Sequence, residues 1–131
     1  MTQEEKNLLL KDLCGRLLYN VIINCTEDDD KRTNFNCFFT GDMFKDIQNG
    51  TAMWNIKPYL RPMSSMTEEE KEEYNKTKDK IAIQWDDYGA PVGYEYAYTI
   101  KTFDWLNSHH FDYRGLIKKG LAIEAPEGMY E

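Results

Sequence analysis

The apolar residues of this chain follow two different spacings, and this alternation constrains the fold more than any other feature of the sequence. Between residues 2 and 15 they recur at helical intervals, whereas residues 16–25 and 92–98 show the β-branched and aromatic patterns typical of strands. Helical and strand-like segments alternate along the chain without a repeat or a low-complexity linker. We therefore predict a single α+β domain over residues 1–131, built on an antiparallel sheet of about five strands.

Capping signals place the helices. Thr2 with Glu5, and Thr67 with Glu70, match the capping box in which a threonine and a glutamate satisfy each other's free amides. The first box predicts an N-terminal helix that ends at Gly15, and the second predicts a helix with a thin apolar face that lies on the surface. Further helices are expected over 41–50, 99–110 and 111–120. The last two form a C-terminal helix pair.

The strands are expected between these helices. Residues 16–25 and 35–40 predict a hairpin with a charged tip at 26–34, and residues 51–57 predict a third strand. Residues 81–85 and 92–98 predict two more, joined by a turn at 86–91. The segment around Pro58 and Pro62 is expected to be extended or turned.

Charge and composition exclude several classes of protein. The chain has 16 Lys+Arg against 23 Asp+Glu, and this net charge of -7 argues against bulk nucleic-acid binding. The acidic start does not resemble a secretory signal, and no apolar run approaches the ~18 residues of a membrane span, so a cytoplasmic location without membrane contact is expected. Cys14, Cys25 and Cys37 fit no zinc spacing and are expected to be buried free thiols.

An aromatic stripe is the first candidate site. Tyr94, Tyr96 and Tyr98 share one face of a strand, and with Trp85 on the preceding strand they could form an aromatic binding floor. Tyrosine is also common simply because it suits half-buried strands. The only basic patches, at 76–80 and 118–119, lie in an acidic background, so a nucleic-acid binder ranks behind the other candidates.

Arginines beside aromatic residues form a second candidate. Arg61 follows Tyr59 in the segment held by two prolines, and Arg114 follows Tyr113, so a guanidinium could bind an anion while a ring stacks on the ligand. Ordinary structural ion pairs would explain the same residues. The predicted ligand-binding residues are Tyr59, Arg61, Trp85, Tyr94, Tyr96, Trp105, His109, His110, Tyr113 and Arg114.

The two histidines allow an enzymatic alternative. His109 and His110 are adjacent, so on a helix they point about 100° apart and are poor joint metal ligands. One imidazole with a carboxylate such as Asp112 could still act as a general base. Packing at a helix end is the simpler interpretation. The sequence predicts no metal site and no cofactor, and it designates no catalytic residue.

Three segments carry a resemblance: residues 2–17, residues 56–67, and residues 104–122 with the run His109, His110, Phe111, Asp112, Tyr113. Together they resemble a group of small uncharacterised proteins from gut Bacteroidales and their phages or prophages. The group has Leu-Pro-Tyr after the first helix, where this chain has Leu17, Leu18 and Tyr19. The resemblance implies no activity and no catalytic residues.

What the resemblance implies is a context, because small phage accessory proteins bind and disable host factors or sequester nucleotide signals in counter-defence. The expected function is therefore a non-enzymatic binding protein in the bacterial host cytoplasm, whose partner is a host protein or a small anionic nucleotide-type ligand. Two alternatives remain open. One is a small enzyme that uses His109 or His110 with Asp112, and the other is a structural or regulatory interaction protein, for example a homo-oligomer, without a small-molecule site.

Overall fold

The computed structural model describes residues 1–27, 33–52 and 54–130. Contacts divide the chain into two compact units, residues 1–65 with 107–131 and residues 66–106, which we call the first and the second unit. The α+β class is confirmed. The strands are shared between a four-stranded sheet and a separate hairpin. The expectation of one domain stays a prediction.

The first unit contains the four-stranded sheet. Its strands, in the spatial order β2-β1-β3-β6, are β1 (Ile22–Thr26), β2 (Asn34–Phe38), β3 (Asn55–Leu60) and β6 (Ile123–Glu124). β1 is antiparallel to both β2 and β3, which confirms the predicted hairpin; its tip at 28–32 lies outside the described residues. β6 is parallel to β3 and was not predicted, because two paired residues leave no periodicity to detect.

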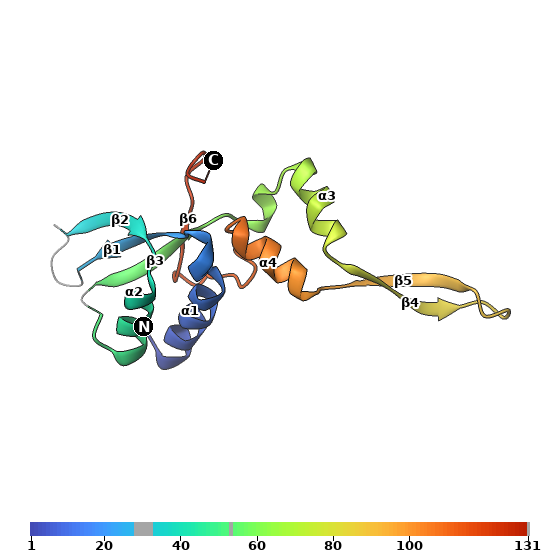
Figure 1. Ribbon diagram of the computed structural model, residues 1–131, viewed down its shortest axis with the longest axis horizontal. Helices are drawn as coiled ribbons and strands as arrows, with labels where there is room; N and C mark the ends of the chain where they lie inside the picture. The colour runs from blue at the N-terminus through green and yellow to red at the C-terminus, as the bar shows by residue number, and fades with distance from the viewer. Residues whose placement is uncertain (28–32, 53, 131) are drawn as a thin grey trace. The chain divides into compact units, whose positions relative to one another are not determined.

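Two helices lie on one side of this sheet, α1 (Gln3–Arg16) and α2 (Gly41–Asn49) (Figure 1). The core consists of apolar side chains from these helices and from the facing side of the sheet, among them Leu9, Leu13, Ile23, Cys25, Ile47, Ile56 and Leu60. The other side of the sheet is polar: the Asn24 amide donates to Asn34 (2.7 Å) and Asn36 (3.0 Å). The sheet therefore has one buried and one hydrated face.

The first helix runs further than predicted. It does not end at Gly15 but continues to Arg16 and a 3-10 turn η1 (Leu17–Tyr19), so the following strand begins at 22 and not at 16. A side chain at Gly15 would lie 2.9 Å from the Asn107 amide nitrogen, so this glycine permits a close approach and does not end the helix. Arg16 is buried and held helical by its ion pair with Asp12 one turn earlier.

The third strand also differs from the predicted strand at both its start and its end. β3 begins at Asn55 and passes through Pro58, which pairs with Ile23 of β1. A proline fits here because its missing N–H lies where β6 has not yet joined the ladder, which starts at Tyr59. A short 3-10 turn η2 (Met63–Ser65) follows.

Only one helix of the predicted C-terminal pair forms. α4 (Ile100–Ser108) is present, but residues 113–120 are a series of turns, so the helix predicted over 111–120 is wrong. Gly115 has a φ of 72°, which breaks a right-handed helix at its middle. Asp112 still caps this segment, since its carboxylate accepts the N–H groups of Leu116 (2.8 Å) and Ile117 (3.0 Å).

The second unit contains α3 (Glu68–Lys76), β4 (Asp79–Trp85), β5 (Pro91–Ala97) and the start of α4. The predicted capping box of α3 is confirmed. β4 and β5 form an antiparallel ribbon, residues 79–97, which we call the arm; Figure 1 shows the arm extending away from α3 and α4. At its tip the Asp86 carboxylate accepts the N–H groups of Tyr88 and Ala90, both at 2.9 Å.

The cysteines are free thiols, but they are not all buried. Cys25 lies in the core, Cys37 is half-buried and Cys14 is exposed. The expectation for Cys14 is wrong because Asp12 and Arg16 occupy the inward side of the last turns of α1, and Cys14 is on the outer side.

Candidate binding surfaces

The arm exposes apolar side chains on both faces. Lys80 lies opposite Tyr96 and Ala82 opposite Tyr94, which places these tyrosines on one face, whereas Ile81 lies opposite Glu95 on the other. The following arm and flanking residues expose between 44% and 61% of their surface: Ile81, Ile83, Trp85, Val92, Tyr94, Tyr96 and Tyr98. A strand ribbon normally buries one face, so this exposure is unusual for its composition.

The tyrosine face of the arm is also cationic. The Lys80 ammonium lies 3.9 Å from the ring centre of Tyr94. The Lys78 ammonium lies 4.1 Å from the ring centre of Tyr74 and 5.2 Å from that of Tyr98. Cations over aromatic faces keep their charge available to an anionic group beside the ring. The lysine run and the tyrosine stripe are far apart in the sequence, but the register of the hairpin places Lys80 beside Tyr94 and Tyr96.

A cluster of threonines fixes the root of the arm. The Thr99 hydroxyl donates to the Thr77 carbonyl oxygen (2.7 Å), and the buried Thr102 hydroxyl accepts the Thr99 N–H (3.0 Å). These bonds tie the end of α3 to the start of α4 on either side of the ribbon. Sequence reasoning missed this cluster, because threonines separated by more than 20 residues carry no joint pattern.

Trp105 packs against α3 at the root of the arm. Its ring centre lies 5.6 Å from that of Tyr74, and its indole N–H donates to the Glu73 carboxylate at 3.3 Å. Burial, together with the neighbouring Tyr98, raises the pKa of Tyr74 to about 12. Trp85 lies near the tip, opposite Pro91 and beyond two register irregularities, so the ladder pairs it with none of the three tyrosines.

The other predicted ligand residues lie in the first unit, around the segment 110–114. The Arg61 guanidinium lies 4.2 Å from the ring centre of Phe111, and its backbone N–H donates to the His110 carbonyl (2.7 Å). The Tyr59 hydroxyl donates to Asn36 on the polar face of the sheet (3.1 Å). Arg61 therefore stacks on Phe111 and not on Tyr59, the aromatic neighbour expected from the sequence.

Tyr113 and Arg114 adjoin a buried ion pair. Arg16 is fully buried and contacts both carboxylate oxygens of Asp12, at 2.7 Å and 3.1 Å, and the Phe111 carbonyl at 2.6 Å. Arg114 lies 3.5 Å from the same carboxylate, and both guanidinium groups lie within 5.2 Å of the Tyr113 ring centre. Arg16 is therefore withdrawn from solvent, whereas the Arg114 side chain keeps 29% of its surface exposed.

Asp112, the carboxylate predicted to work with a histidine, is engaged with the backbone. Both Asp112 oxygens accept backbone N–H groups, and the His109 Nδ1 lies 3.1 Å from the Ser108 hydroxyl. His110 is stacked on Tyr130, and its buried Nδ1 has no hydrogen-bond partner among the described residues. Burial, and then the positive charge of Arg16, lower the pKa of His110 to about 4, which favours the neutral imidazole.

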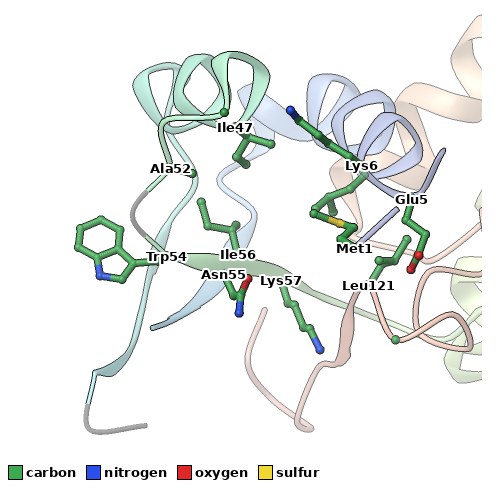
Figure 2. Close-up of a pocket in the computed structure, with 13 residues that line it drawn as sticks. Met1, Glu5, Lys6, Ile47, Ala52, Trp54, Asn55, Ile56, Lys57 and Leu121 are labelled. Carbon is green, nitrogen blue, oxygen red and sulfur yellow. The ribbon is translucent and has the colours of Figure 1, made fainter. Parts of the chain in front are cut away.

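A groove with a volume of about 480 Å³ lies in the first unit beside the start of β3 (Figure 2). We call it the β3 groove. Its wall contains Leu9, Ile47, Ile56 and Leu121, and its polar lining includes Glu5, Lys6, Asn55 and Lys57. Figure 2 shows Ile56 pointing toward Ile47, whereas Asn55 and Lys57 point to the opposite side of the strand. None of these residues was predicted, since a groove between distant segments leaves no local pattern.

The predicted site residues are therefore divided between the two units and do not form one site within either of them. Tyr94 and Tyr96 lie on the arm face, Trp85 lies near its tip and Trp105 at its root, whereas Tyr59, Arg61, His109, His110, Tyr113 and Arg114 belong to the first unit. Within the described ranges, no group of three or more His, Cys, Asp or Glu side chains is placed to hold a metal ion. Nor does any described helix combine the length and apolarity needed to cross a membrane.

Comparison with protein families, with curated proteins and with solved structures finds no match to this chain.

Proposed function

We propose that this protein is a non-enzymatic binding protein and that the arm is the surface that contacts its partner. The observation that carries this proposal is the exposure of apolar side chains on both faces of the ribbon. Within the described residues β4 and β5 pair only with each other, so the ribbon also has two open edges. A two-stranded ribbon is marginally stable in water, and contiguous exposed apolar surface marks interaction sites.

The partner that fits this surface is a protein. Nucleic-acid bases can stack on Tyr94 and Tyr96, but they offer nothing to the aliphatic side chains of Ile81 and Ile83 on the ribbon. A protein cleft can cover both kinds of side chain. Lys78 and Lys80 beside the tyrosines favour a cleft with acidic groups at its rim.

The biological setting we propose follows from the resemblance to phage-associated proteins of Bacteroidales. The partner would be a host protein in the bacterial cytoplasm, disabled when the arm occupies its cleft. A second candidate function, sequestration of a nucleotide-type signal, is favoured by the contact of Lys80 with the Tyr94 ring. A thermal-shift screen with cyclic and linear nucleotides tests it, and no shift with any nucleotide eliminates it.

Site-specific photo-crosslinking in host cells tests the arm. A benzoylphenylalanine replaces Tyr96 on the arm or, as a control, the exposed Lys11 on α1. We expect one discrete protein adduct from position 96 and none from position 11. The adduct partner is then purified and titrated, and we expect Lys80→Glu to weaken binding about tenfold and Lys11→Glu to leave it unchanged. Equal adducts from both positions, or no adduct from position 96, contradict the proposal.

A further inference from the structure

One edge of β3 is open next to the β3 groove. β3 pairs with β1 along residues 55–58, but on its other side it pairs with β6 only at Tyr59 and Leu60. Among the described residues, no strand lies beside the first half of β3 on that side. The Leu60 carbonyl accepts the Ala125 N–H, so alternation along the strand turns the backbone groups of Pro58 and Ile56 to this edge as well. Pro58 supplies no N–H, which leaves Ile56 as the amide donor of this part of the edge. Unpaired strand edges are templates for the addition of a further strand.

The groove offers apolar pockets along this edge. Ile56 comes from β3 itself, Ile47 from α2, Leu9 from α1, and Leu121 from the segment that leads into β6. A strand added to the edge places alternate side chains on the same face as Ile56, toward this apolar wall. The volume of about 480 Å³ is within the range of sites that enclose small ligands or a few side chains.

The charge around the groove is positive, although the chain as a whole is acidic. Lys6 and Lys57 line the groove, and neither forms an ion pair with a described residue. The single acidic residue of the lining, Glu5, is engaged in the cap of α1, where its carboxylate accepts the Thr2 N–H (3.1 Å). The lining therefore has two lysines, one on each side of β3, and its glutamate is already engaged in the cap.

We propose that the β3 groove binds an extended, acidic peptide segment of a partner protein, which adds as a strand to the open edge of β3. Main-chain hydrogen bonds to β3 would provide affinity, an apolar side chain on the face of Ile56 would provide register, and carboxylates on the other face, beside Lys57, would provide selectivity. This site is separate from the arm and does not depend on the function proposed for it.

Defined peptides test this site on the full chain. The probe is acetyl-Thr-Glu-Val-Glu-Val-Glu-Thr-amide, and its comparison peptides replace glutamate with lysine or carry N-methyl groups on alternate amides. Calorimetry measures affinity, and amide chemical shifts locate the contact. We expect the acidic peptide to bind with shifts at residues 54–57, the lysine peptide to bind at least about tenfold more weakly, and the N-methylated peptide not to bind.

Charge-reversal variants complete the test. Lys57→Glu should weaken binding of the acidic peptide about five- to tenfold, whereas Lys45→Glu, which makes the same charge change at an exposed position of α2 outside the groove, should not. Tyr96→Ser on the arm should leave peptide binding unchanged. The proposal is overturned if no peptide binds at millimolar concentration, if the N-methylated or lysine peptide binds equally well, or if Lys45→Glu weakens binding as much as Lys57→Glu.

Discussion

The ring of Tyr130 is stacked on the imidazole of His110, with 3.7 Å between the ring centres and 15° between the planes. The Tyr130 hydroxyl donates to the Tyr59 carbonyl (2.7 Å) and accepts the Ile22 N–H (3.0 Å). It bridges β1 and β3 just beyond their last paired residues, Ile23 and Pro58. A side chain near the C-terminus therefore completes the ladder of the central strands and covers His110.

Removing this hydroxyl should destabilise the first unit. In Tyr130→Phe the stacking on His110 is kept, but the Ile22 N–H and the Tyr59 carbonyl lose their partner. We expect a loss of about 1–3 kcal/mol in the free energy of unfolding, measured by urea denaturation. Tyr88→Phe is the matched control, because Tyr88 is 96% exposed, and it should change stability negligibly. Equal stability of the two variants would show that the bridge does not contribute.

The stability of the protein should fall in mild acid because of His110. Its pKa is about 4 in the folded protein against an ordinary value of 6.5, so between these values the unfolded chain takes up more protons. Stability is therefore retained above pH 6.5 and lost as the pH falls toward 4. His110 accounts for about 2 kcal/mol of the loss between pH 7.5 and pH 5.

The matched variant for this pH effect is His110→Asn, since asparagine tolerates the φ of 63° found at this position. Urea unfolding at a series of pH values should give the variant a flatter profile than the natural chain above pH 5. Parallel profiles would mean that His110 does not titrate differently in the folded and unfolded states.

The buried ion pair should behave asymmetrically. Asp12→Asn removes the charge that faces the fully buried Arg16, and we expect it to cost about 3–5 kcal/mol. The double variant Asp12→Leu/Arg16→Met replaces both charges with apolar groups, and it should be far closer in stability to the natural chain. Thermal unfolding of the two variants measures the difference. A double variant less stable than Asp12→Asn would contradict this account.

Thiol chemistry should separate the cysteines. Cys14 is exposed, whereas burial, and then the neighbouring Cys37, raise the pKa of the Cys25 thiol to about 12. Because the thiolate is the reactive form, Ellman's reagent at pH 8 should modify Cys14 rapidly and Cys25 only on unfolding. Cys14→Ser should remove the fast phase. A fast phase that persists in this variant would place another thiol at the surface.

The sequence predicted the local features of the fold better than its long-range ones. The capping threonines Thr2 and Thr67 were assigned correctly because a cap depends on residues three positions apart. The prediction that the helix ends at Gly15 was wrong, because the contact that requires a glycine there is with Asn107, which is far away in the chain. The helix expected over 111–120 does not form, because Gly115 has a left-handed backbone conformation. A glycine is compatible with either conformation, so the residue type did not reveal which one it adopts.

The candidate site was predictable only in part, for the same reason. The tyrosine stripe follows from the two-residue period of a strand, but the exposure of Tyr94 and Tyr96 emerges only from the structure. The contact of Lys80 with Tyr94 depends on hairpin register, and the β3 groove depends on segments from three parts of the chain. Neither leaves a signal within a single stretch of sequence.

The central claim is that the arm is the contact surface, and the affinity of the crosslinked partner for an arm variant tests it most directly. Calorimetry compares Tyr94→Ser/Tyr96→Ser with Leu18→Ser, which changes an exposed apolar residue of η1 outside the arm. The account predicts that the double variant binds about 100-fold more weakly, with the unfolding of the first unit unchanged, and that Leu18→Ser binds nearly as well as the natural chain. Unchanged affinity of the double variant would contradict it.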